Sequence, residues 1–211
     1  MTARLILGSA SPARTALLGQ AGIQHTVMVS AVDEDAATAA AGEPSPQETA
    51  LLLARAKAEA VSALPEAAGA LVLGCDSVFE FDGVAYGKPH LAAVAKQRIT
   101  ELSGRSGVLH TGHWLVDNRS GVGGAGVGAL ASATVHFAPM SEAEIDAYVA
   151  TGEPLEVAGS VTIDSLGGAF VTGVDGDPHA VVGLSVSTLR ELLAQHGMSI
   201  TEFWPRPATV G

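Results

Sequence analysis

The sequence predicts an α/β protein built on a mixed β-sheet with flanking helices, and three observations lead to this prediction. Short apolar runs alternate along the chain with segments that carry helix-start signals, as in α/β folds. Hairpin signals such as Asp82-Gly83 interrupt the alternation, so some neighbouring strands are expected to run antiparallel. The 211 residues are 47% hydrophobic and 4% aromatic, which provides for a substantial core of alanine, valine and leucine side chains.

The chain begins with a buried strand that passes directly into a helix. Arg4–Leu7 forms the apolar run of the strand. Ser11 is a favoured helix cap and Pro12 fits the first helical turn, so a helix is predicted from there to Gln20. A second strand is expected at residues 25–30.

Caps and apolar runs also place the later elements. Ser45-Pro-Gln-Glu48 is a capping box, and Ser141-Glu-Ala-Glu144 repeats the pattern, so a helix is expected after each serine. Residues 31–46 are acidic and then rich in alanine and proline, and are predicted to form a loop. The remaining strands are expected at residues 71–73, 78–86, 108–117, 129–138 and 158–174, with a turn at Asp175-Gly176, and the helices at residues 46–62, 89–102, 141–150 and 186–196. No repeat or long linker divides the chain, so one domain over residues 1–211 is expected.

Charge and composition exclude several classes of function. The formal net charge is −11, from 11 basic and 22 acidic residues, and such a surface repels nucleic acid and anionic membranes. Cys75 is the one cysteine, which excludes a disulfide framework within the chain. The sequence has neither a signal-peptide pattern nor an apolar run of about 20 residues. A cytoplasmic protein without nucleic-acid or membrane partners is therefore expected.

Three patterns that resemble functional motifs have simpler interpretations. Gly121–Gly126 matches G-x-G-x-x-G, but no helix start follows it, so a flexible turn is predicted. His110 and His113 lie three apart in a predicted strand, which puts their side chains on opposite faces and argues against a shared zinc ion. Ser185 lacks the G-x-S-x-G context of a nucleophile and is predicted to cap the last helix.

The first strand ends in a way that suits an anion. Gly8-Ser9-Ala10-Ser11 leads straight into the helix, so several backbone N–H groups at the helix start have no intrahelical partner. Arg14 adds a positive charge in the first turn, where the helix dipole disfavours cations. This placement predicts a bound anion. The alternative is a solvated arginine on a surface helix.

Acidic and basic residues elsewhere fit a metal-dependent reaction on phosphates. Asp76 follows the apolar run 71–73, a position where open α/β sheets bind ligands. Glu34 lies in the acidic run Asp33-Glu-Asp35, and two such sites suffice for a magnesium ion that also binds substrate phosphates. Lys57 and Lys88 are available as cations for phosphate. Each residue alone has an ordinary alternative: a turn cap, a solvated loop or a surface lysine.

Taken together, these motifs resemble those of the Maf nucleotide pyrophosphatases, in family order and over nearly the whole chain. The motifs that carry the resemblance are Leu7-Gly-Ser-Ala-Ser-Pro-Ala-Arg14, Val32-Asp-Glu34, Ala54-Arg-Ala-Lys57, Gly74-Cys-Asp-Ser77, Gly87-Lys-Pro89, Leu102-Ser-Gly-Arg105, Thr111-Gly112, Glu142–Val149, Ala158-Gly-Ser160, Leu166-Gly-Gly168 and Ala180-Val-Val-Gly-Leu184.

The resemblance implies a fold and an activity. The implied fold is a curved mixed β-sheet with flanking helices in two lobes around a cleft, similar to inosine triphosphate pyrophosphatases. The implied activity is hydrolysis of nucleoside triphosphates, particularly non-canonical or modified ones, to a monophosphate and diphosphate with a divalent metal such as Mg or Mn. Some members are linked to the arrest of cell division and septum formation, and homodimers are common in the family.

Four residues are expected to bind the triphosphate by this resemblance. Ser9 and Arg14 are expected to contact it, and Lys57 and Lys88 to neutralise its charge. Many relatives carry two consecutive arginines after Ser-Pro, whereas Ala13 replaces the first of them here. One phosphate contact of those relatives is therefore either absent or supplied from elsewhere.

The resemblance also implies metal, catalytic and base-recognition roles. Glu34 and Asp76 are expected to hold the metal, and Asp76 is the expected proton acceptor. Asp164 falls where relatives carry a glutamine or an acid near the base and the catalytic water. The glutamine of the dTTP- and UTP-preferring branch is not found there, so the preferred base stays open.

Two other functions remain alongside the pyrophosphatase. One is a non-catalytic nucleotide-binding regulator of cell division, and the other is a phosphatase that releases orthophosphate. The joint presence of Glu34, Lys57, Asp76 and Lys88 favours the enzyme, because a protein that only binds nucleotides does not need a base.

Overall fold

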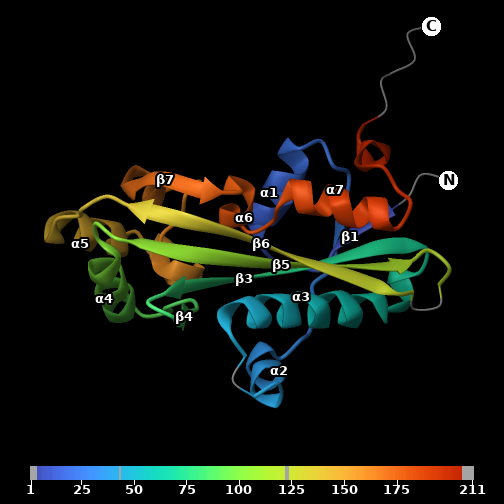
Figure 1. The fold of residues 1–211 in the computed structure, drawn as a ribbon, viewed down its shortest axis with the longest axis horizontal. Coiled ribbons are helices and arrows are strands. Elements are labelled where there is room, and N and C mark those ends of the chain that lie inside the picture. The colour runs from blue at the N-terminus through green and yellow to red at the C-terminus, as the bar shows by residue number, and fades with distance from the viewer. Residues whose placement is uncertain (1–3, 43, 122–123, 206–211) are drawn as a thin grey trace, which may run out of the picture.

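The protein folds around one mixed β-sheet of seven strands, which confirms the predicted α/β class (Figure 1). The computed structural model describes residues 4–42, 44–121 and 124–205. The strands are β1 (Arg4–Leu7), β2 (Thr26–Val27), β3 (Ala70–Phe81), β4 (Val84–Tyr86), β5 (Ser106–Asn118), β6 (Gly126–Phe137) and β7 (Val171–Gly176). Their order in the sheet is β2-β1-β3-β5-β6-β7, with β4 paired to β3. β1 is parallel to β2 and β3, and the other pairs are antiparallel.

Helices cover both faces of the sheet. They are α1 (Pro12–Gln20), α2 (Glu34–Ala40), α3 (Pro46–Ser62), α4 (Ala92–Leu102), α5 (Glu142–Ala150), α6 (Pro178–Val182) and α7 (Val186–Gln195). The long helix α3 lies along β3 and β5, and α1, α6 and α7 lie on the opposite face (Figure 1). Within the described ranges, no helix has the length and apolar character that crossing a membrane requires.

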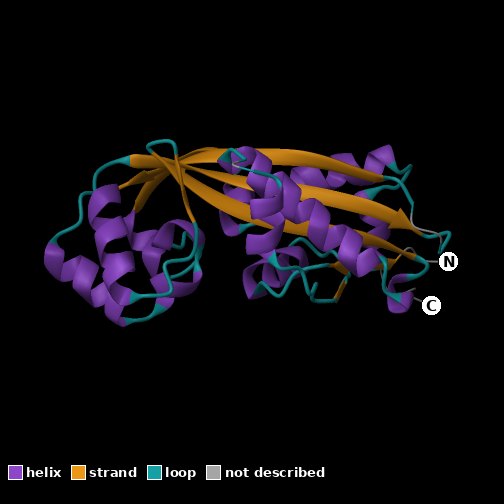
Figure 2. Ribbon diagram, turned by 90° about the horizontal axis from the view of Figure 1, so that it is seen from below, coloured by secondary structure: helices purple, strands orange, loops and turns teal. Residues whose placement is uncertain are grey.

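Two main hydrophobic cores lie at opposite ends of the long strands. One joins Leu7 and Leu73 to the buried leucines of α1 and α7. The other joins Phe79 and Phe137 to the buried side chains of α4 and α5. Figure 2 shows the helices gathered in two groups, with β3, β5 and β6 running from one to the other. Buried side chains therefore anchor β3 on both sides of the segment between the two cores.

The elements that carry strong local signals are confirmed. Ser11 caps α1, and the capping boxes at Ser45 and Ser141 begin α3 and α5. The Asp82-Gly83 turn has positive φ at both residues, 50° and 78°, and joins β3 to β4 as a hairpin. Ser185 caps α7 as predicted.

The predicted loop over residues 31–46 is wrong, because α2 occupies Glu34–Ala40. The side chain of Asp33 accepts a hydrogen bond from the Ala36 N–H at 2.9 Å and so caps this helix. Glu34 and Asp35 lie in the first turn, where acidic side chains complement the helix dipole. The acidic run is thus a helix start. α2 has no buried residue and projects beyond α3 (Figure 1).

The predicted long strand over residues 158–174 is also wrong. Two 3₁₀ turns, Ala158–Ser160 and Leu166–Phe170, lie within it, and β7 begins only at Val171. Gly159 has φ +75°, which a strand does not accommodate. Asp175 and Gly176, predicted as a turn, are the last two residues of β7. The short helix α6 follows.

Three boundaries differ from the prediction. β2 is only Thr26–Val27, and α4 begins at Ala92 and not at Pro89. Asp76 was expected just beyond a strand, but it lies inside β3, because antiparallel pairing with β5 continues to Glu80. The glycine-rich stretch 121–126 joins β5 to β6, and residues 122–123 of it lie outside the described residues.

Candidate active site

Strand β3 has a gap along one edge. β1 pairs with residues Ala70–Leu73 of β3, and β4 pairs with residues Phe79–Phe81. Among the described strands, residues 74–78 therefore have a partner only on the β5 side. Asp76 stands at the centre of this segment, which we call the β3 gap.

The β3 gap exposes backbone hydrogen-bonding groups. Strand residues direct their N–H and C=O groups alternately to the two edges. The Leu73 carbonyl accepts a hydrogen bond from the Gly8 N–H at 2.7 Å across the β1 edge, so Cys75 and Ser77 face that same edge. The Cys75 carbonyl accepts from Arg14 Nη1 at 2.9 Å. Within the described residues, no hydrogen bond is formed by the N–H groups of Cys75 and Ser77, so both are available as donors at the gap.

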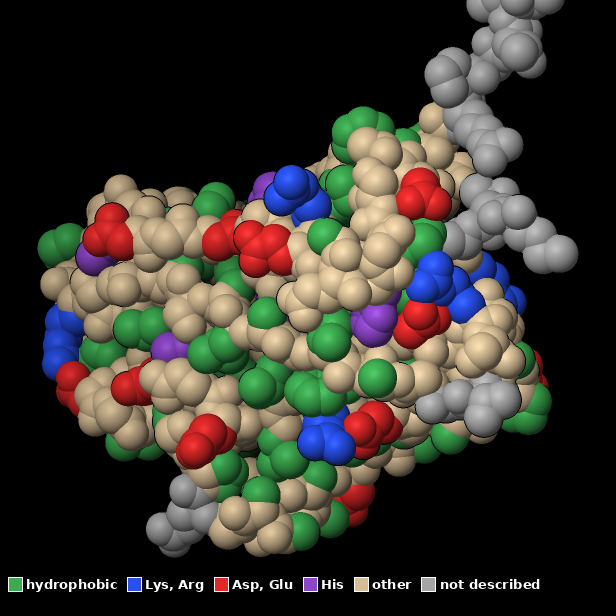
Figure 3. Space-filling view, turned by 45° about the vertical axis from the view of Figure 1, so that its right-hand side comes forward, with side chains coloured by type: hydrophobic (Ala, Val, Ile, Leu, Met, Phe, Trp, Pro, Cys, Tyr) green, Lys and Arg blue, Asp and Glu red, His purple; other side chains and the backbone are tan. Residues whose placement is uncertain are grey.

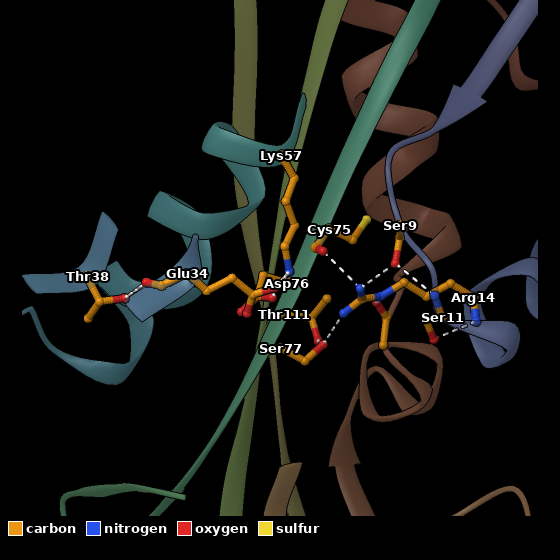
Figure 4. A network of polar contacts seen from close by, with 11 residues as sticks. Ser9, Ser11, Arg14, Glu34, Thr38, Lys57, Cys75, Asp76, Ser77 and Thr111 are labelled. Carbon is orange, nitrogen blue, oxygen red and sulfur yellow. Dashed lines mark hydrogen bonds and ion pairs between the residues drawn. The ribbon is translucent and has the colours of Figure 1, made fainter. Parts of the chain in front are cut away.

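Lys57 joins the two acidic residues that the sequence singled out. Its Nζ lies 2.5 Å from Asp76 Oδ1 and 2.8 Å from Glu34 Oε1. Lys57 and Asp76 are each 8% exposed, whereas Glu34 reaches in from the start of the exposed helix α2. Figure 4 shows the three side chains meeting on one side of β3.

Two glycines allow α3 to lie close enough for this contact. A Cβ atom at Gly74 would lie 2.1 Å from the Ala54 carbonyl oxygen, and one at Gly112 would lie 2.2 Å from the Ala50 carbonyl oxygen. Both alanines belong to α3, one and two turns before Lys57. The glycines thus let the helix backbone rest on the sheet, which brings the Lys57 ammonium to the Asp76 carboxylate.

Burial changes the acidity of Asp76. Loss of water around the carboxylate raises the pKa of Asp76 above its ordinary value, and the positive charges of Lys57 and Arg14 offset only part of this effect. A carboxylate with a raised pKa is a stronger base. Asp76 is therefore suited to accept a proton from water.

Arg14 lies on the other side of β3 and is bonded extensively within the protein. Its Nε donates to the Gly183 carbonyl at 2.7 Å, Nη1 donates to Ser9 Oγ at 2.9 Å, and Nη2 donates to Ser77 Oγ at 3.0 Å (Figure 4). With the bond to Cys75, four donor contacts hold the buried guanidinium in place. Arg14 thus ties α1 to β3 and to the segment before α7, in addition to its predicted role toward phosphate.

Ser9 and Ser11 line the exit of β1 beside the gap. Ser9 Oγ accepts from the Ser11 N–H at 3.2 Å as well as from Arg14, and Ser9 is 7% exposed. Ser11 Oγ accepts from the Arg14 N–H at 3.4 Å and caps α1. The helix start predicted as an anion site therefore adjoins the β3 gap.

Lys88 and Asp164 are not joined to this cluster by any contact among the described residues. Lys88 follows β4 on the far side of the gap, and its Nζ lies 3.9 Å from Glu156 Oε2. Asp164 lies exposed between the two 3₁₀ turns, without a hydrogen-bond or ion-pair partner in the described ranges. The proposed contacts of these two residues with substrate stay predictions.

Sequence reasoning gave no role to Ser77 and Thr111, which complete the network. Ser77 Oγ lies 2.9 Å from Thr111 Oγ1, which donates to the Ala180 carbonyl at 2.8 Å. Ser77 must therefore donate to Thr111 while it accepts from Arg14. The alternating side-chain directions of a strand could have indicated this role, because they place Ser77 on the face opposite Asp76, the face on which Arg14 lies.

Glu34 and Asp76 fit a divalent cation. Their carboxylates are close enough to share the Lys57 ammonium, and hard cations such as Mg²⁺ prefer carboxylate oxygens. The described residues contain no group of three or more His, Cys, Asp or Glu side chains placed to hold a metal. A magnesium site here would be of the kind that completes its coordination with water and substrate phosphates.

Comparison with known proteins identifies close relatives. The sequence model of the Maf-like protein family matches residues 4–196. A nucleoside triphosphate pyrophosphatase of Leifsonia xyli subsp. xyli is 56% identical over 209 residues, which cover 96% of this chain and 97% of that protein. Proteins of the same name from Streptomyces coelicolor and Nocardia farcinica are 52% and 47% identical, and each alignment covers at least 94% of both chains. Among solved structures, a HAM1 protein from Coxiella burnetii has a TM-score of 0.42 and 16% identity, covering 65% of this chain and 74% of that chain.

Proposed function

The chain belongs to the Maf-like protein family, and we infer from this membership and from the β3 gap that it is a nucleoside triphosphate pyrophosphatase, a hydrolase of phosphoanhydride bonds. The observation that carries the inference is the junction of Lys57 with Asp76 and Glu34 at an unpaired strand edge. A cation, two carboxylates and free N–H donors are the groups that hydrolysis of a polyphosphate requires.

We propose that the triphosphate lies across the β3 gap. Ser9 and the N–H groups of Cys75 and Ser77 provide hydrogen-bond donors for phosphate oxygens. Lys57 and Arg14 supply positive charge from either side of β3, and Lys88 supplies it from beyond β4. Donors and cations fixed before the reaction stabilise the charge that develops in the transition state without reorganising.

The proposed reaction transfers the α-phosphoryl group to water. Asp76 accepts a proton from the water as its oxygen attacks the α-phosphorus, and the bond from that phosphorus to the bridging oxygen breaks. The products are a nucleoside monophosphate and diphosphate, whose negative charge Lys57 and Lys88 balance. Glu34 and Asp76 would hold a divalent cation, Mg or Mn, which when bound supplies Lewis-acid stabilisation of the phosphate oxygens.

Further expectations about the enzyme belong to this proposal. Asp164 would lie near the base of a (d)NTP, and non-canonical or modified nucleotides are the proposed substrates. Residues 1–211 would form one domain whose two lobes enclose the substrate. The proposed setting is the cytoplasm, with homodimers as the assembly. Figure 3 shows lysine and arginine side chains interspersed with acidic ones over one face, with no continuous basic surface among the described residues there, and the formal net charge is −11, which supports a small-molecule substrate over nucleic acid as the partner.

One panel of assays tests the proposed function. Purified protein is incubated with Mg²⁺ or Mn²⁺ and with normal and modified nucleoside triphosphates, and both diphosphate and orthophosphate are measured. Release of one diphosphate per monophosphate is the expected result. Orthophosphate as the main product would show a phosphatase. Nucleotide binding without any release would show the regulator of cell division, which the names of the relatives do not favour.

A further inference from the structure

The carboxylate of Glu153 is the acceptor of an unusually dense set of hydrogen bonds. Glu153 begins the 3₁₀ turn Glu153–Glu156, which follows α5. Five donors converge on its two oxygens: Tyr148 Oη at 2.9 Å, Thr162 Oγ1, Gly167 N at 3.0 Å, Ser165 Oγ at 2.8 Å and Leu166 N at 3.2 Å. Four of these donors come from residues 162–167, so one carboxylate organises a whole loop.

The loop over residues 162–167 is folded tightly around this carboxylate. A Cβ atom at Gly167 would lie 2.5 Å from Tyr148 Oη and 2.7 Å from the Thr162 backbone nitrogen and oxygen. Tyr148 Oη also accepts from the Thr162 N–H at 3.2 Å. Both flanks of the loop are thus fixed, and Asp164 lies between them with its side chain exposed. These contacts hold the backbone on both sides of Asp164 in a defined position.

The same turn also holds the segment that carries Lys88. The Leu155 carbonyl accepts a hydrogen bond from the His90 N–H at 3.0 Å. Glu156 lies 3.9 Å from Lys88 and 3.3 Å from His90 through its carboxylate oxygens. These exposed side-chain contacts add little stability alone, but the backbone hydrogen bond joins the two segments directly. The turn therefore connects two site residues that do not touch each other.

We propose that Glu153 is a positioning residue, whose carboxylate fixes residues 162–167 and thereby sets the place of Asp164 relative to Lys88 at the substrate site. The proposal rests on the proposed function, because it assigns Asp164 and Lys88 to that site. Glu153 itself touches neither substrate nor metal in this arrangement.

The charge of Glu153 is suited to this role. Partial burial favours the neutral acid, but the hydrogen bonds from Thr162, Gly167, Ser165 and Tyr148 outweigh burial and lower the pKa of Glu153 to about 2. A carboxylate only accepts hydrogen bonds, whereas an amide also donates. In Glu153→Gln, the amide NH₂ group would face N–H or O–H donors of the loop, so some of the hydrogen bonds that the carboxylate accepts would be lost.

Hydrogen exchange and kinetics of Glu153→Gln test the proposal. We expect faster exchange at Leu166 and Gly167, unchanged exchange in β3 and α3, and at least a roughly tenfold loss of kcat/KM, the scale for losing a hydrogen bond to a charged group. The matched control is Glu144→Gln, whose carboxylate accepts hydrogen bonds from the N–H and hydroxyl of Ser141 at the start of α5. Unchanged exchange and kcat/KM in Glu153→Gln would overturn the proposal.

A double-mutant cycle separates positioning from general stability. If Glu153 acts through Asp164, the double variant Glu153→Gln, Asp164→Ala has the kcat/KM of Asp164→Ala alone. If the double variant instead loses kcat/KM by the product of the two single-variant losses, the proposal is overturned. Ser165→Ala removes one donor from the loop side. Ser165→Ala is expected to lower kcat/KM less than Glu153→Gln does, and to cause no further loss when Asp164→Ala is already present. If Glu153→Gln does not fold, Ser165→Ala takes its place in the cycle.

Binding of a triphosphate analogue distinguishes this proposal from the proposed function. A wild-type protein that binds a non-hydrolysable α,β-methylene triphosphate but releases no diphosphate would refute the pyrophosphatase. The double-mutant cycle is then measured as affinity for the analogue. A loss of affinity in Glu153→Gln that is absent when Asp164 is replaced supports the positioning role. Equal affinity of Glu153→Gln and the wild type overturns it. A wild-type protein that binds no analogue overturns both.

Discussion

The ammonium of Lys57 lies 2.5 Å from the carboxylate of Asp76, and both residues are buried. They come from residues 19 apart in sequence, one on α3 and one in β3. Glu34 shares the same ammonium from the exposed helix α2. A buried acid, a buried cation and an accessible acid thus meet at the one stretch of β3 that lacks a strand on one edge in the described sheet.

Asp76→Asn tests the proposed proton acceptor. An amide cannot accept a proton from water, so turnover is expected to fall by at least ~10², the scale for losing a general base. Circular dichroism should show a folded protein. The matched control is Asp146→Asn, whose carboxylate pairs with Lys96 on α4, away from β3. Diphosphate release at the wild-type rate by Asp76→Asn would remove Asp76 from the mechanism.

Lys88→Ala tests the cation beyond β4. Its side chain is half exposed and its ion pair with Glu156 spans 3.9 Å, so the melting temperature is expected to stay within about 2 °C of wild type, given that such pairs contribute about 0–1 kcal/mol. KM for the triphosphate should rise, because one charge that balances the phosphates is lost. Lys96→Ala is the control for removal of an exposed lysine. A large drop in melting temperature would instead show that Lys88 is structural.

Gly74→Ala tests the close packing of α3 on β3. The added Cβ would lie 2.1 Å from the Ala54 carbonyl oxygen and 2.7 Å from the Ala58 nitrogen, so the helix must move. We expect a loss of about 1–3 kcal/mol in the free energy of unfolding, as for overpacked cores. Activity should fall as well, because Lys57 moves with α3.

Gly19→Ala is the matched control for that variant. Gly19 lies inside α1 and no atom approaches its hypothetical Cβ within 4 Å. Alanine is expected to stabilise the helix by about 0.4–1 kcal/mol at such a position. Urea unfolding of both variants measures the difference, and equal stability of the two would contradict the packing argument.

The burial of His113 leads us to expect a loss of stability in mild acid. Burial, reinforced by the charge of Arg14, lowers the pKa of His113 to about 4, and its Nε2 accepts a hydrogen bond from the Ser185 N–H at 2.8 Å. The unfolded chain binds this proton near pH 6.5, whereas the folded chain does not until about pH 4. The free energy of unfolding should therefore fall as the pH drops from 6.5 to 4, by on the order of 3 kcal/mol from this group.

A histidine variant isolates this contribution. His113→Gln keeps a hydrogen-bond acceptor for Ser185 but has no proton to bind in this range. Its free energy of unfolding, measured in urea at several pH values, should change less between pH 6.5 and 4 than that of the wild type. Equal pH dependence in the two proteins would show that folding does not lower the pKa of His113.

The sequence predicted the capped helices well and the glycine-punctuated region poorly. Ser11, Ser45 and Ser141 begin helices as expected, because a cap and its N–H partner lie within three residues. The strand predicted over residues 158–174 is instead two 3₁₀ turns followed by the start of β7, and Glu153 holds the loop over residues 162–167, which lies between the turns and runs into the second one. That carboxylate acts on donors 9 to 14 residues away, which no local pattern reveals.

The acidic run Asp33-Glu-Asp35 shows that one sequence pattern is compatible with both a loop and a helix start. Acids after a strand are typical of solvated loops, but the same residues cap α2 and favour its first turn. Glu34 reaches Lys57 only because that helix forms. The predicted metal role of Glu34 therefore depends on an element that was not predicted.

The sequence by itself determined the starts of the capped helices α1, α3, α5 and α7, the mixed sheet and the set of charged residues, since hydrophobic periodicity and capping act over a few neighbouring residues. Only the tertiary structure decided that Asp76 lies in a gap of the sheet edge and that Arg14 holds Gly183, which is 169 residues away. It also decided that Gly74 and Gly112 admit the α3 backbone. These relationships depend on which surfaces pack together, and packing joins residues whose separation along the chain leaves no periodic signal.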